Sequence, residues 1–356
     1  MSCERIEKIR AALGAGEAAL ITSGANRHYL TDFRSSAGEV LITESGAYFF
    51  IDFRYVEKAK KEAQGVQVIL AEQVYAQIAK AMKEDGATVL IPEAEETSLA
   101  SFARLKKNLP DVILANDGKI DRALREARAI KSAEEIGYIR EAQRMTDETF
   151  SYILERIAVG RTEREVMLDM EFFMRRMGSE GVAFDFIVVS GANSSLPHGV
   201  PTDKKIARGD FVTMDFGAVY HGYRSDMTRT VALGEVSEEQ RRVYDTVLAA
   251  QAASLAAIRA GASCRDVDAA ARDLINEAGY TGCFGHGLGH SVGIDIHEYP
   301  SCSPRSEATL APGMLMTVEP GVYLEGKFGV RIEDLVLVTE DGYENLTKSE
   351  KKLIVL

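Results

Sequence analysis

The second half of the chain repeats itself, and this repeat constrains the fold more than any other feature. Residues 157–166 (IAVGRTEREV) correspond to residues 258–267 (IRAGASCRDV), 101 positions later. In each copy a glycine is followed by Thr or Ser and then, three residues on, by an acid, which is the pattern that ends one helix and caps the next. The correspondence resumes at 209–217 and 313–321. We therefore expect two half-domains of one helix–helix–sheet plan within residues 130–340.

Four carboxylates occupy equivalent positions in the two copies. Asp215 corresponds to Glu319 and Asp226 to Glu333, and all four lie in otherwise apolar, strand-like segments. A carboxylate in a buried strand is costly unless it is paired or bound to a metal. Two hairpins related by a pseudo-two-fold axis would bring the four acids together, where they repel unless cations lie between them. By elimination the pattern predicts a dinuclear metal site; the alternative is four separate solvated or arginine-paired carboxylates.

Four of the six histidines lie close to glycine or proline in the same half of the chain. They are His198, His286, His290 and His297. The run 285–290 (GHGLGH) is not a zinc-binding helix, because its glycines form helices poorly and the Glu of His-Glu-x-x-His is missing. It also lacks the spacing of a dinucleotide fingerprint. The glycines indicate backbone that passes close to a crowded site. His28 and His221 are interpreted as structural or surface residues.

The first part of the chain alternates strand-like and helix-like segments. Strands are predicted at 18–22, 39–43, 47–51, 66–70, 88–91 and 112–115, and helices at 55–64, 74–83 and 98–109. This alternation predicts an α/β layer with a partly parallel sheet. A charged helix at 120–129 follows as a connector, and a long helix begins at Ser132, capped with Glu135, and ends towards Gly160. We expect domains at 1–125 and 126–356.

Charge and composition exclude several classes of function. The chain has 42 basic and 54 acidic residues, a net charge of −12. This balance argues against a general nucleic-acid or anionic-membrane binder, which would need a basic face. No apolar run approaches the ~18–20 residues that span a bilayer. The N-terminus shows no signal-peptide pattern, and the four cysteines show no Cys-x-x-Cys spacing. These features predict a cytoplasmic protein with free thiols.

Taken together, the motifs of the second part resemble those of the pita-bread dinuclear metallopeptidases, within them the aminopeptidase P and prolidase branch. The motifs are the Asp215-x₁₀-Asp226 pair, GHGLGH at 285–290, TVEPG at 317–321 and VRIED at 330–334. Residues 26–33 (NRHYLTDF) and 52–55 (DFRY) resemble the N-terminal domain of creatinases and Xaa-Pro peptidases. The resemblance covers nearly the whole chain. It implies an α/β N-terminal domain plus an α+β pita-bread C-terminal domain with an internal pseudo-two-fold repeat.

The same resemblance implies a role for each site residue. Five residues match the family's metal ligands: Asp215, Asp226, His290, Glu319 and Glu333. Asp226 and Glu333 match the ligands that bridge both ions, and Glu319 matches the ligand that also carries a proton. His198 and His297 match the histidines that contact substrate, His286 a residue that lines the pocket, and Arg331 an arginine that orients the site. Oxygen ligands with one imidazole suit two divalent ions, Mn²⁺ foremost, with Co²⁺, Zn²⁺ or Fe²⁺ also compatible.

The implied activity is hydrolysis of the Xaa-Pro bond at a peptide N-terminus, with a proline-containing peptide as substrate and a homodimer as the assembly. Prolidases, which cleave Xaa-Pro dipeptides, often place an arginine four residues after the histidine matched by His297. Here that position is Ser301, and Arg305 is the nearest arginine. This departure favours aminopeptidase P over prolidase. A metal-free creatinase-type hydrolase and a non-catalytic peptide-binding module on the same fold are disfavoured, because such relatives lose metal ligands and all five are present here.

Overall fold

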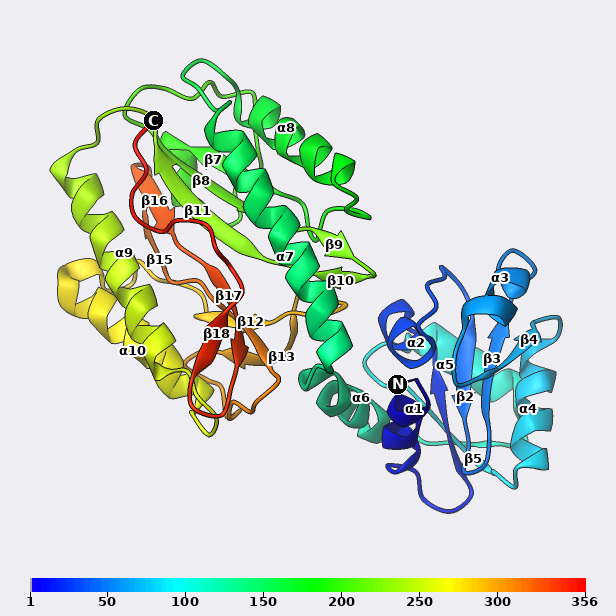
Figure 1. Ribbon diagram of the computed structural model, residues 1–356. Helices are drawn as coiled ribbons and strands as arrows, with labels where there is room; N and C mark the ends of the chain where they lie inside the picture. Colours follow the sequence, from blue (N-terminus) through cyan, green and yellow to red (C-terminus); the bar gives the residue numbers. More distant parts are fainter. Residues whose placement is uncertain (1) are drawn as a thin grey trace. The chain divides into compact units, whose positions relative to one another are not determined.

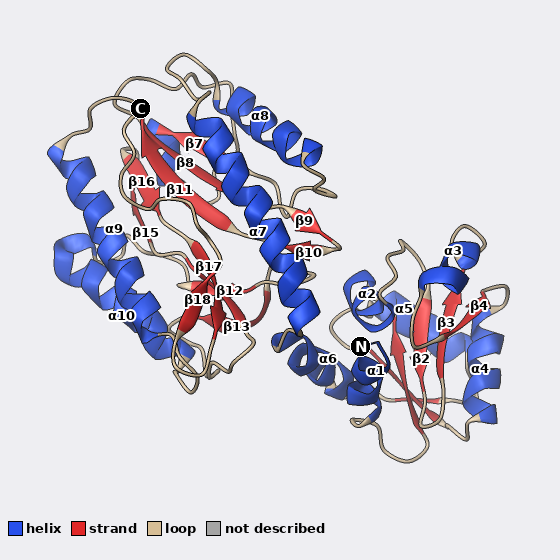
Figure 2. Cartoon of the chain, in the orientation of Figure 1, coloured by secondary structure: helices blue, strands red, loops and turns tan. Residues whose placement is uncertain are grey.

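The computed structural model describes residues 2–356, and the chain separates into two compact units. The first unit ends at Arg128 and the second covers Ala129–Leu356. The division falls near the end of helix α6 (Lys119–Ala129), the helix within which the sequence places the boundary at 125/126. Figure 1 follows the chain through both units, and Figure 2 shows helices and strands in each.

The first unit is built on a six-stranded mixed sheet of order β4-β3-β2-β1-β5-β6. Its strands are β1 (Glu17–Ile21), β2 (Glu39–Ile42), β3 (Ala47–Ile51), β4 (Gln67–Leu70), β5 (Val89–Pro92) and β6 (Ile113–Leu114). Its other helices are α1 (Ser2–Arg10), α2 (Gly24–Thr31), α3 (Val56–Glu62), α4 (Val74–Glu84) and α5 (Leu99–Asn108). Strands β1, β2 and β3 pair antiparallel, whereas the other pairs are parallel. The predicted strands and the partly parallel sheet are confirmed, but helices α1 and α2 were not predicted.

The second unit contains four long helices around several small sheets. The helices are α7 (Ala133–Leu154), α8 (Glu163–Arg176), α9 (Glu238–Ala257) and α10 (Cys264–Ile275). The first half has β7 (Ile187–Ser190), a 3₁₀ turn η1 (Gly191–Ser195), β8 (Phe211–Phe216), β9 (Val219–Tyr220), β10 (Tyr223–Arg224) and β11 (Met227–Ala232). The second half has β12 (Gly289–Ser291), β13 (Glu298–Cys302), β14 (Leu315–Val318), β15 (Gly321–Leu324), β16 (Phe328–Arg331), β17 (Asp334–Val338) and β18 (Tyr343–Asn345).

The repeat seen in the sequence is a repeat in space. Helices α7 and α8 precede the antiparallel pair β8–β11, and α9 and α10 precede the antiparallel pair β14–β17. In Figure 1 the two helix pairs lie on opposite sides of these strands. One three-stranded sheet has the order β11-β8-β7 and the other β14-β17-β18. The predicted plan of two half-domains is therefore confirmed.

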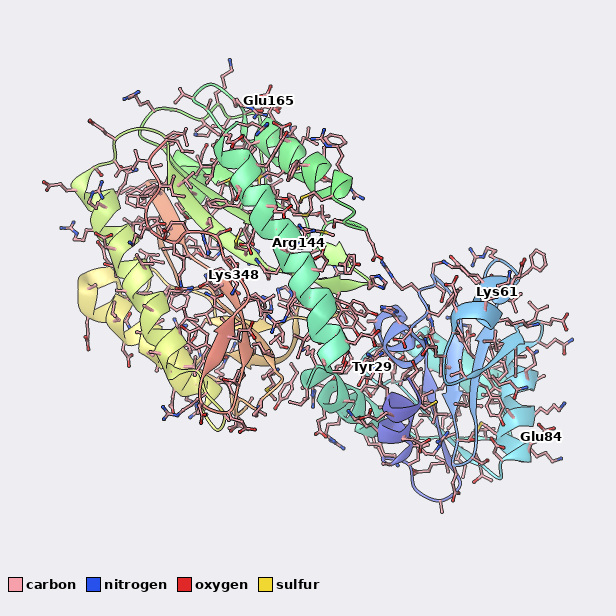
Figure 3. All side chains as sticks on the ribbon, viewed as in Figure 1. Tyr29, Lys61, Glu84, Arg144, Glu165 and Lys348 are labelled. Carbon is pink, nitrogen blue, oxygen red and sulfur yellow. The ribbon has the colours of Figure 1, made fainter. Side chains whose placement is uncertain are left out.

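Helix ends follow the predicted capping rules with two exceptions. Ser132 and Thr162 form complete capping boxes with Glu135 and Glu165; the latter lies at the N-terminal end of α8 (Figure 3). Ser263 is an N-cap whose side chain makes no capping hydrogen bond, so the second copy of the repeat lacks the complete capping box of the first.

The end of helix α7 also differs from the prediction. The helix stops at Leu154, not near Gly160, because the next residues form a tighter turn in which the Arg156 amide donates to the Ile153 carbonyl. Gly160 follows with φ of 92°, so its left-handed backbone belongs to the connection and not to the helix end.

The central hairpin of the second unit is buried on both faces. Every residue of β8 and β11 is buried, including Arg229, which is 1 % exposed. Its guanidinium donates to the carbonyls of Glu333 and Ser349 and pairs with Asp334 at 2.8 Å. Burial by itself raises the pKa of Asp334, but Arg229 and Lys351 outweigh it and hold this pKa below its usual value. The pair ties β11 to β17 and to the C-terminal segment.

We predict that Arg229→Met lowers the unfolding midpoint of the second unit by roughly 6–20 °C, because removing one partner of a buried ion pair leaves a buried charge. Arg140→Met is the matched control, since the Arg140–Glu344 pair is exposed and worth less than about 1 kcal/mol. Thermal unfolding of metal-free protein measures both. Equal shifts in the two variants would contradict a supporting role for the buried pair.

Candidate metal centre

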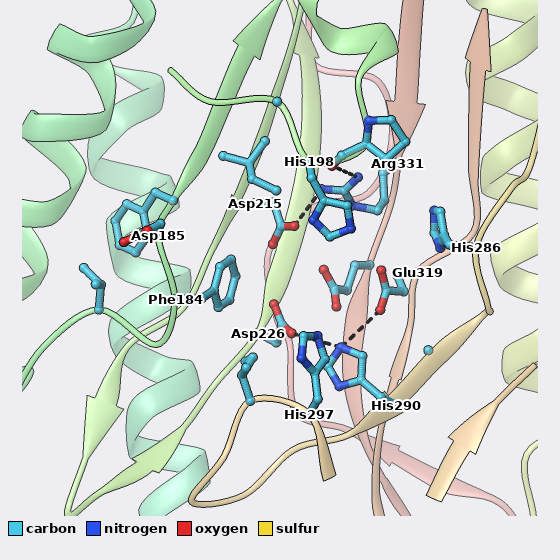
Figure 4. Close-up of a pocket in the computed structure, with 18 of the residues that line it drawn as sticks. Phe184, Asp185, His198, Asp215, Asp226, His286, His290, His297, Glu319 and Arg331 are labelled. Carbon is cyan, nitrogen blue, oxygen red and sulfur yellow. Dashed lines mark hydrogen bonds and ion pairs between the residues drawn. The ribbon is translucent and has the colours of Figure 1, made fainter. Parts of the chain in front are cut away.

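The two hairpins bring their acids to one place. Asp215 lies in β8 and Glu319 directly follows β14, whereas Asp226 and Glu333 directly precede β11 and β17. Because each hairpin is antiparallel, the end of one strand and the start of the next carry their acids at the same end. Carboxylate oxygens of Asp215, Asp226 and Glu333 lie within 4.8 Å of one another. Glu319 faces the same space (Figure 4).

His290 joins the carboxylates from strand β12. Its Nε2 lies 3.6 Å from Asp226 Oδ2 and 3.4 Å from Glu319 Oε1. Its Nδ1 lies 3.1 Å from the carbonyl oxygen of Ser291, which only accepts, so Nδ1 carries the proton and Nε2 presents its lone pair to the acids. Burial and the neighbouring His297 lower the pKa of His290 to about 4. The neutral imidazole is the form that binds metal.

Burial and mutual repulsion disfavour the charged forms of the carboxylates in the cluster. Burial raises the pKa of Glu319 to about 8, with Asp215 adding to the rise and Arg331 opposing it. Burial and the neighbouring acids likewise raise the pKa values of Asp226 and Glu333. Asp215 Oδ1 and Glu333 Oε1 are buried without a hydrogen-bond partner among the described residues. Divalent cations would supply the missing partners, so this donor set fits them.

Arg331 is the cation held directly against the cluster. It is buried, and its Nη2 pairs with Asp215 Oδ2 at 2.6 Å. Its Nε donates to Thr228 Oγ1 at 2.9 Å, and Thr228 in turn donates to Glu333 Oε2 at 2.7 Å. Its Nη1 donates to the hydroxyl of Tyr323 at 2.8 Å. One guanidinium thus orients acids from both hairpins.

Three residues that hold the acids were not predicted. Thr228 orients Glu333, and Thr317 donates to Glu319 Oε1 at 3.0 Å. Tyr323 connects Arg331 to His286, whose Nε2 lies 2.9 Å from its hydroxyl. Each threonine lies two residues from a predicted ligand on the same strand face, which is the signal that could have found it. Tyr323 carries no such signal, because its partners Arg331 and His286 lie in other segments, strand β16 and the loop before β12.

A cavity of about 770 Å³ opens over the cluster. All five predicted metal ligands line it, together with His198, His286, His297 and Arg331. Phe184, Phe186 and Ile187 give it an apolar wall. Ser301 also lines it, whereas Arg305 is not among its lining residues. The structure therefore brings every predicted site residue to one cavity.

The predicted histidines approach the cluster from different segments. His297 lies with its ring centre 4.4 Å from that of His290, and burial together with His198 lowers its pKa. Burial and Arg331 lower the pKa of His286 to about 4. His198 extends from the loop after η1 (Figure 4). His221 lies outside the cavity, stacked on Tyr138 with ring centres 4.5 Å apart, and His28 lies in α2.

Comparison with known proteins gives this arrangement a family. Residues 137–340 match metallopeptidase family M24, and residues 5–130 match the creatinase/prolidase N-terminal domain. The chain belongs to metallopeptidase family M24. The M24 fold and the resemblance to Xaa-Pro peptidases predicted above are confirmed, including the pita-bread domain preceded by an α/β domain.

Three solved structures show how close this M24 chain is to its relatives. An Xaa-Pro dipeptidase from Bacillus anthracis is 42% identical, with a TM-score of 0.96 and full coverage of both chains. A prolidase from Pyrococcus horikoshii is 36% identical, with a TM-score of 0.92 over 99% of this chain and 100% of the other. An X-Pro aminopeptidase from Thermotoga maritima is 36% identical, with a TM-score of 0.91 over 100% of this chain and 99% of the other.

These likenesses fix the class of activity. The chain is a hydrolase of the Xaa-Pro peptidase group, and the M24 family depends on a dinuclear metal centre. The cluster of Asp215, Asp226 and Glu333 offers carboxylate oxygens close enough together to hold a metal ion. No helix in the described part of the chain has the length and apolar character needed to cross a membrane.

We predict that the Glu319 carboxyl stabilises metal-free protein at about pH 5 and that this contribution declines as the pH rises to about 8. The folded state holds Glu319 protonated up to about pH 8, whereas the unfolded chain releases that proton above about pH 4.5, so folding becomes less favourable across this window. Glu319→Gln, which cannot ionise, should flatten the decline. Thermal unfolding in the presence of a chelator measures it, and identical pH profiles for the two proteins would contradict the effect.

Proposed function

We propose that this protein is a metal-dependent Xaa-Pro dipeptidase. Relatives named Xaa-Pro dipeptidase or prolidase, including one 42% identical over the full chain, support this over the aminopeptidase P activity that the sequence favoured. The observation that carries the proposal is the buried carboxylate cluster with His290, open to a cavity that three further histidines line. A homodimer, implied by the family resemblance, belongs to the same proposal.

Five residues would hold the two ions: Asp215, Asp226, His290, Glu319 and Glu333. Four carboxylates and one imidazole favour Mn²⁺, with Co²⁺, Zn²⁺ and Fe²⁺ also compatible. When bound, the ions would polarise the scissile carbonyl and lower the pKa of a water molecule.

The chain's own residues would then position the peptide and move the proton. Glu319 lines the cavity while Thr317 holds its Oε1, so the carboxylate is fixed where it can receive a proton and pass it to the leaving proline nitrogen. His198 and His297 would donate hydrogen bonds to the substrate carbonyl as it becomes tetrahedral. The aromatic wall formed by Phe184 and Phe186 is suited to the apolar proline ring.

Aminopeptidase P activity is the second candidate, and Ser301 favours it. A dipeptidase must bind the free proline carboxylate, and Ser301 replaces the arginine that often does so. In this chain, Arg164 and the histidines are among the cavity-lining groups that can donate to that carboxylate. The similarity to the X-Pro aminopeptidase from Thermotoga maritima also supports this alternative.

We predict that Mn²⁺-loaded enzyme cleaves an Xaa-Pro dipeptide at least about 10-fold faster, in kcat/KM, than the matching Xaa-Pro-Xaa tripeptide. A charge-assisted hydrogen bond to the free carboxylate contributes about 1.5–3 kcal/mol, which the tripeptide amide lacks. Enzyme treated with a chelator should cleave neither peptide.

Ser301→Arg is the informative variant for this comparison. If the wild-type cavity already binds the carboxylate, the new arginine changes the dipeptide-to-tripeptide ratio by less than about threefold. Faster tripeptide cleavage by the wild type, with a ratio raised by tenfold or more in the variant, would make aminopeptidase P the better assignment.

A further inference from the structure

The His198 side chain lies at an exposed position on its loop. The loop connects β7 to β8, and η1 forms its first turn. The His198 side chain lines the cavity but makes no hydrogen bond with any group between residues 2 and 356. Its own contacts therefore do not fix the imidazole, and its position depends on how the loop backbone is held.

A single buried carboxylate holds both ends of this loop. Glu163, the first residue of α8, is 0 % exposed. Its Oε1 accepts from the amide and hydroxyl of Ser190, at 2.7 and 2.9 Å, and from Asn193 at 3.1 Å. Its Oε2 accepts from the amide and hydroxyl of Thr202, at 3.0 and 2.7 Å. Ser190 and Asn193 precede His198 and Thr202 follows it, so the carboxylate joins the two ends.

This carboxylate is not needed to cap its own helix. The N-terminus of α8 is already closed by the capping box of Thr162 and Glu165. All of the side-chain bonds to Glu163 come from the His198 loop, and burying a carboxylate is costly without such a set of donors. A carboxylate only accepts, so both of its oxygens can serve donors from the loop. A glutamine would present an amide group, itself a donor, to one end.

The segment between the two ends packs directly on the candidate metal centre. The carbonyl of Pro197 accepts from Arg331 Nη1 at 3.2 Å, and Arg331 also holds Asp215. The backbone at Gly199 passes so close to Val189 that an added Cβ would lie 2.7 Å from its Cγ1. The loop therefore lies against β7 on one side and against Arg331 on the other. Figure 4 shows His198 beside Arg331, above the acids.

We propose that Glu163 is the positioning residue for His198: by joining Ser190 and Asn193 to Thr202, its carboxylate sets the loop so that the imidazole faces the substrate. This inference rests on the proposed function, in which His198 contacts the peptide. Glu163 itself does not line the cavity, so it acts through the loop.

A double-mutant cycle tests the proposal with Mn²⁺-loaded enzyme and an Xaa-Pro dipeptide. Glu163→Gln should lower kcat/KM by about 10- to 100-fold, because an ångström of misplacement costs rates of this order, while bound metal stays unchanged. In the His198→Ala background the same substitution should cost less than twofold, since there is no imidazole left to position. Glu165→Gln is the matched control: the same chemical change two residues away, at an exposed position, should leave kcat/KM within twofold.

Thr202→Val provides a second, milder variant if Glu163→Gln does not fold. It removes one hydroxyl donor from one end of the loop and keeps the side-chain shape. We expect a threefold to tenfold loss of kcat/KM that again disappears in the His198→Ala background.

The outcomes separate this inference from the proposed function. Losses from Glu163→Gln or Thr202→Val that are equally large with and without His198 overturn the positioning role. A His198→Ala enzyme with wild-type kcat/KM overturns it too, because positioning His198 would then be without consequence. A wild-type enzyme that cleaves no Xaa-Pro peptide, even when loaded with metal, overturns the proposed function instead.

Discussion

Mutual repulsion among four carboxylates, three of them buried and Glu319 partly buried, is the constraint around which the second unit is built. Asp215, Asp226, Glu319 and Glu333 come from two hairpins whose antiparallel registers deliver one acid from each strand to a common point. Burial and proximity raise the pKa values of three of them, and one guanidinium, that of Arg331, pairs directly with the group. The fold thus holds four acidic side chains at one place, where bound divalent cations would balance their negative charge. Metal binding is in this sense a property of the hairpin geometry as much as of the individual ligands.

The residues proposed to bind metal and those proposed to contact the substrate lie on different kinds of segment. The proposed metal ligands lie on or directly beside strands, where ladder hydrogen bonds and threonine hydroxyls set their orientation. Groups assigned to the substrate lie on longer connections, as is common where binding must adapt to a ligand. His198 is the extreme case, an exposed side chain whose placement depends on the buried carboxylate of Glu163. Carboxylates therefore have two roles in this unit. The clustered acids form a site suited to cations, and the isolated carboxylate of Glu163 holds a loop through hydrogen bonds.

Local patterns in the sequence were enough for the plan of the second unit and for the four candidate carboxylates, whereas His290 became a candidate ligand through the family resemblance. The repeat placed two half-domains, and carboxylates in apolar strands stood out because burial of such groups demands a partner. Features that depend on distant partners were missed. Tyr323 acts between Arg331 and His286, and Glu163 collects donors from residues 27 to 39 positions away, so neither has a local signature. Ser301 favoured aminopeptidase P, whereas the similarity over the whole chain supports the dipeptidase. A single position is a weak guide here, since several groups of a cavity can bind a carboxylate.

The most direct test of the central claim is the anomalous scattering of crystals grown with Mn²⁺. The account predicts two manganese peaks per chain roughly 3.5–4 Å apart, both contacting Asp226 and Glu333, with His290 bound to one of them. In crystals of Glu333→Ala the pair should be lost or reduced to one weakly occupied ion. A single peak in the wild-type protein, or peaks away from the four carboxylates, would contradict the dinuclear centre.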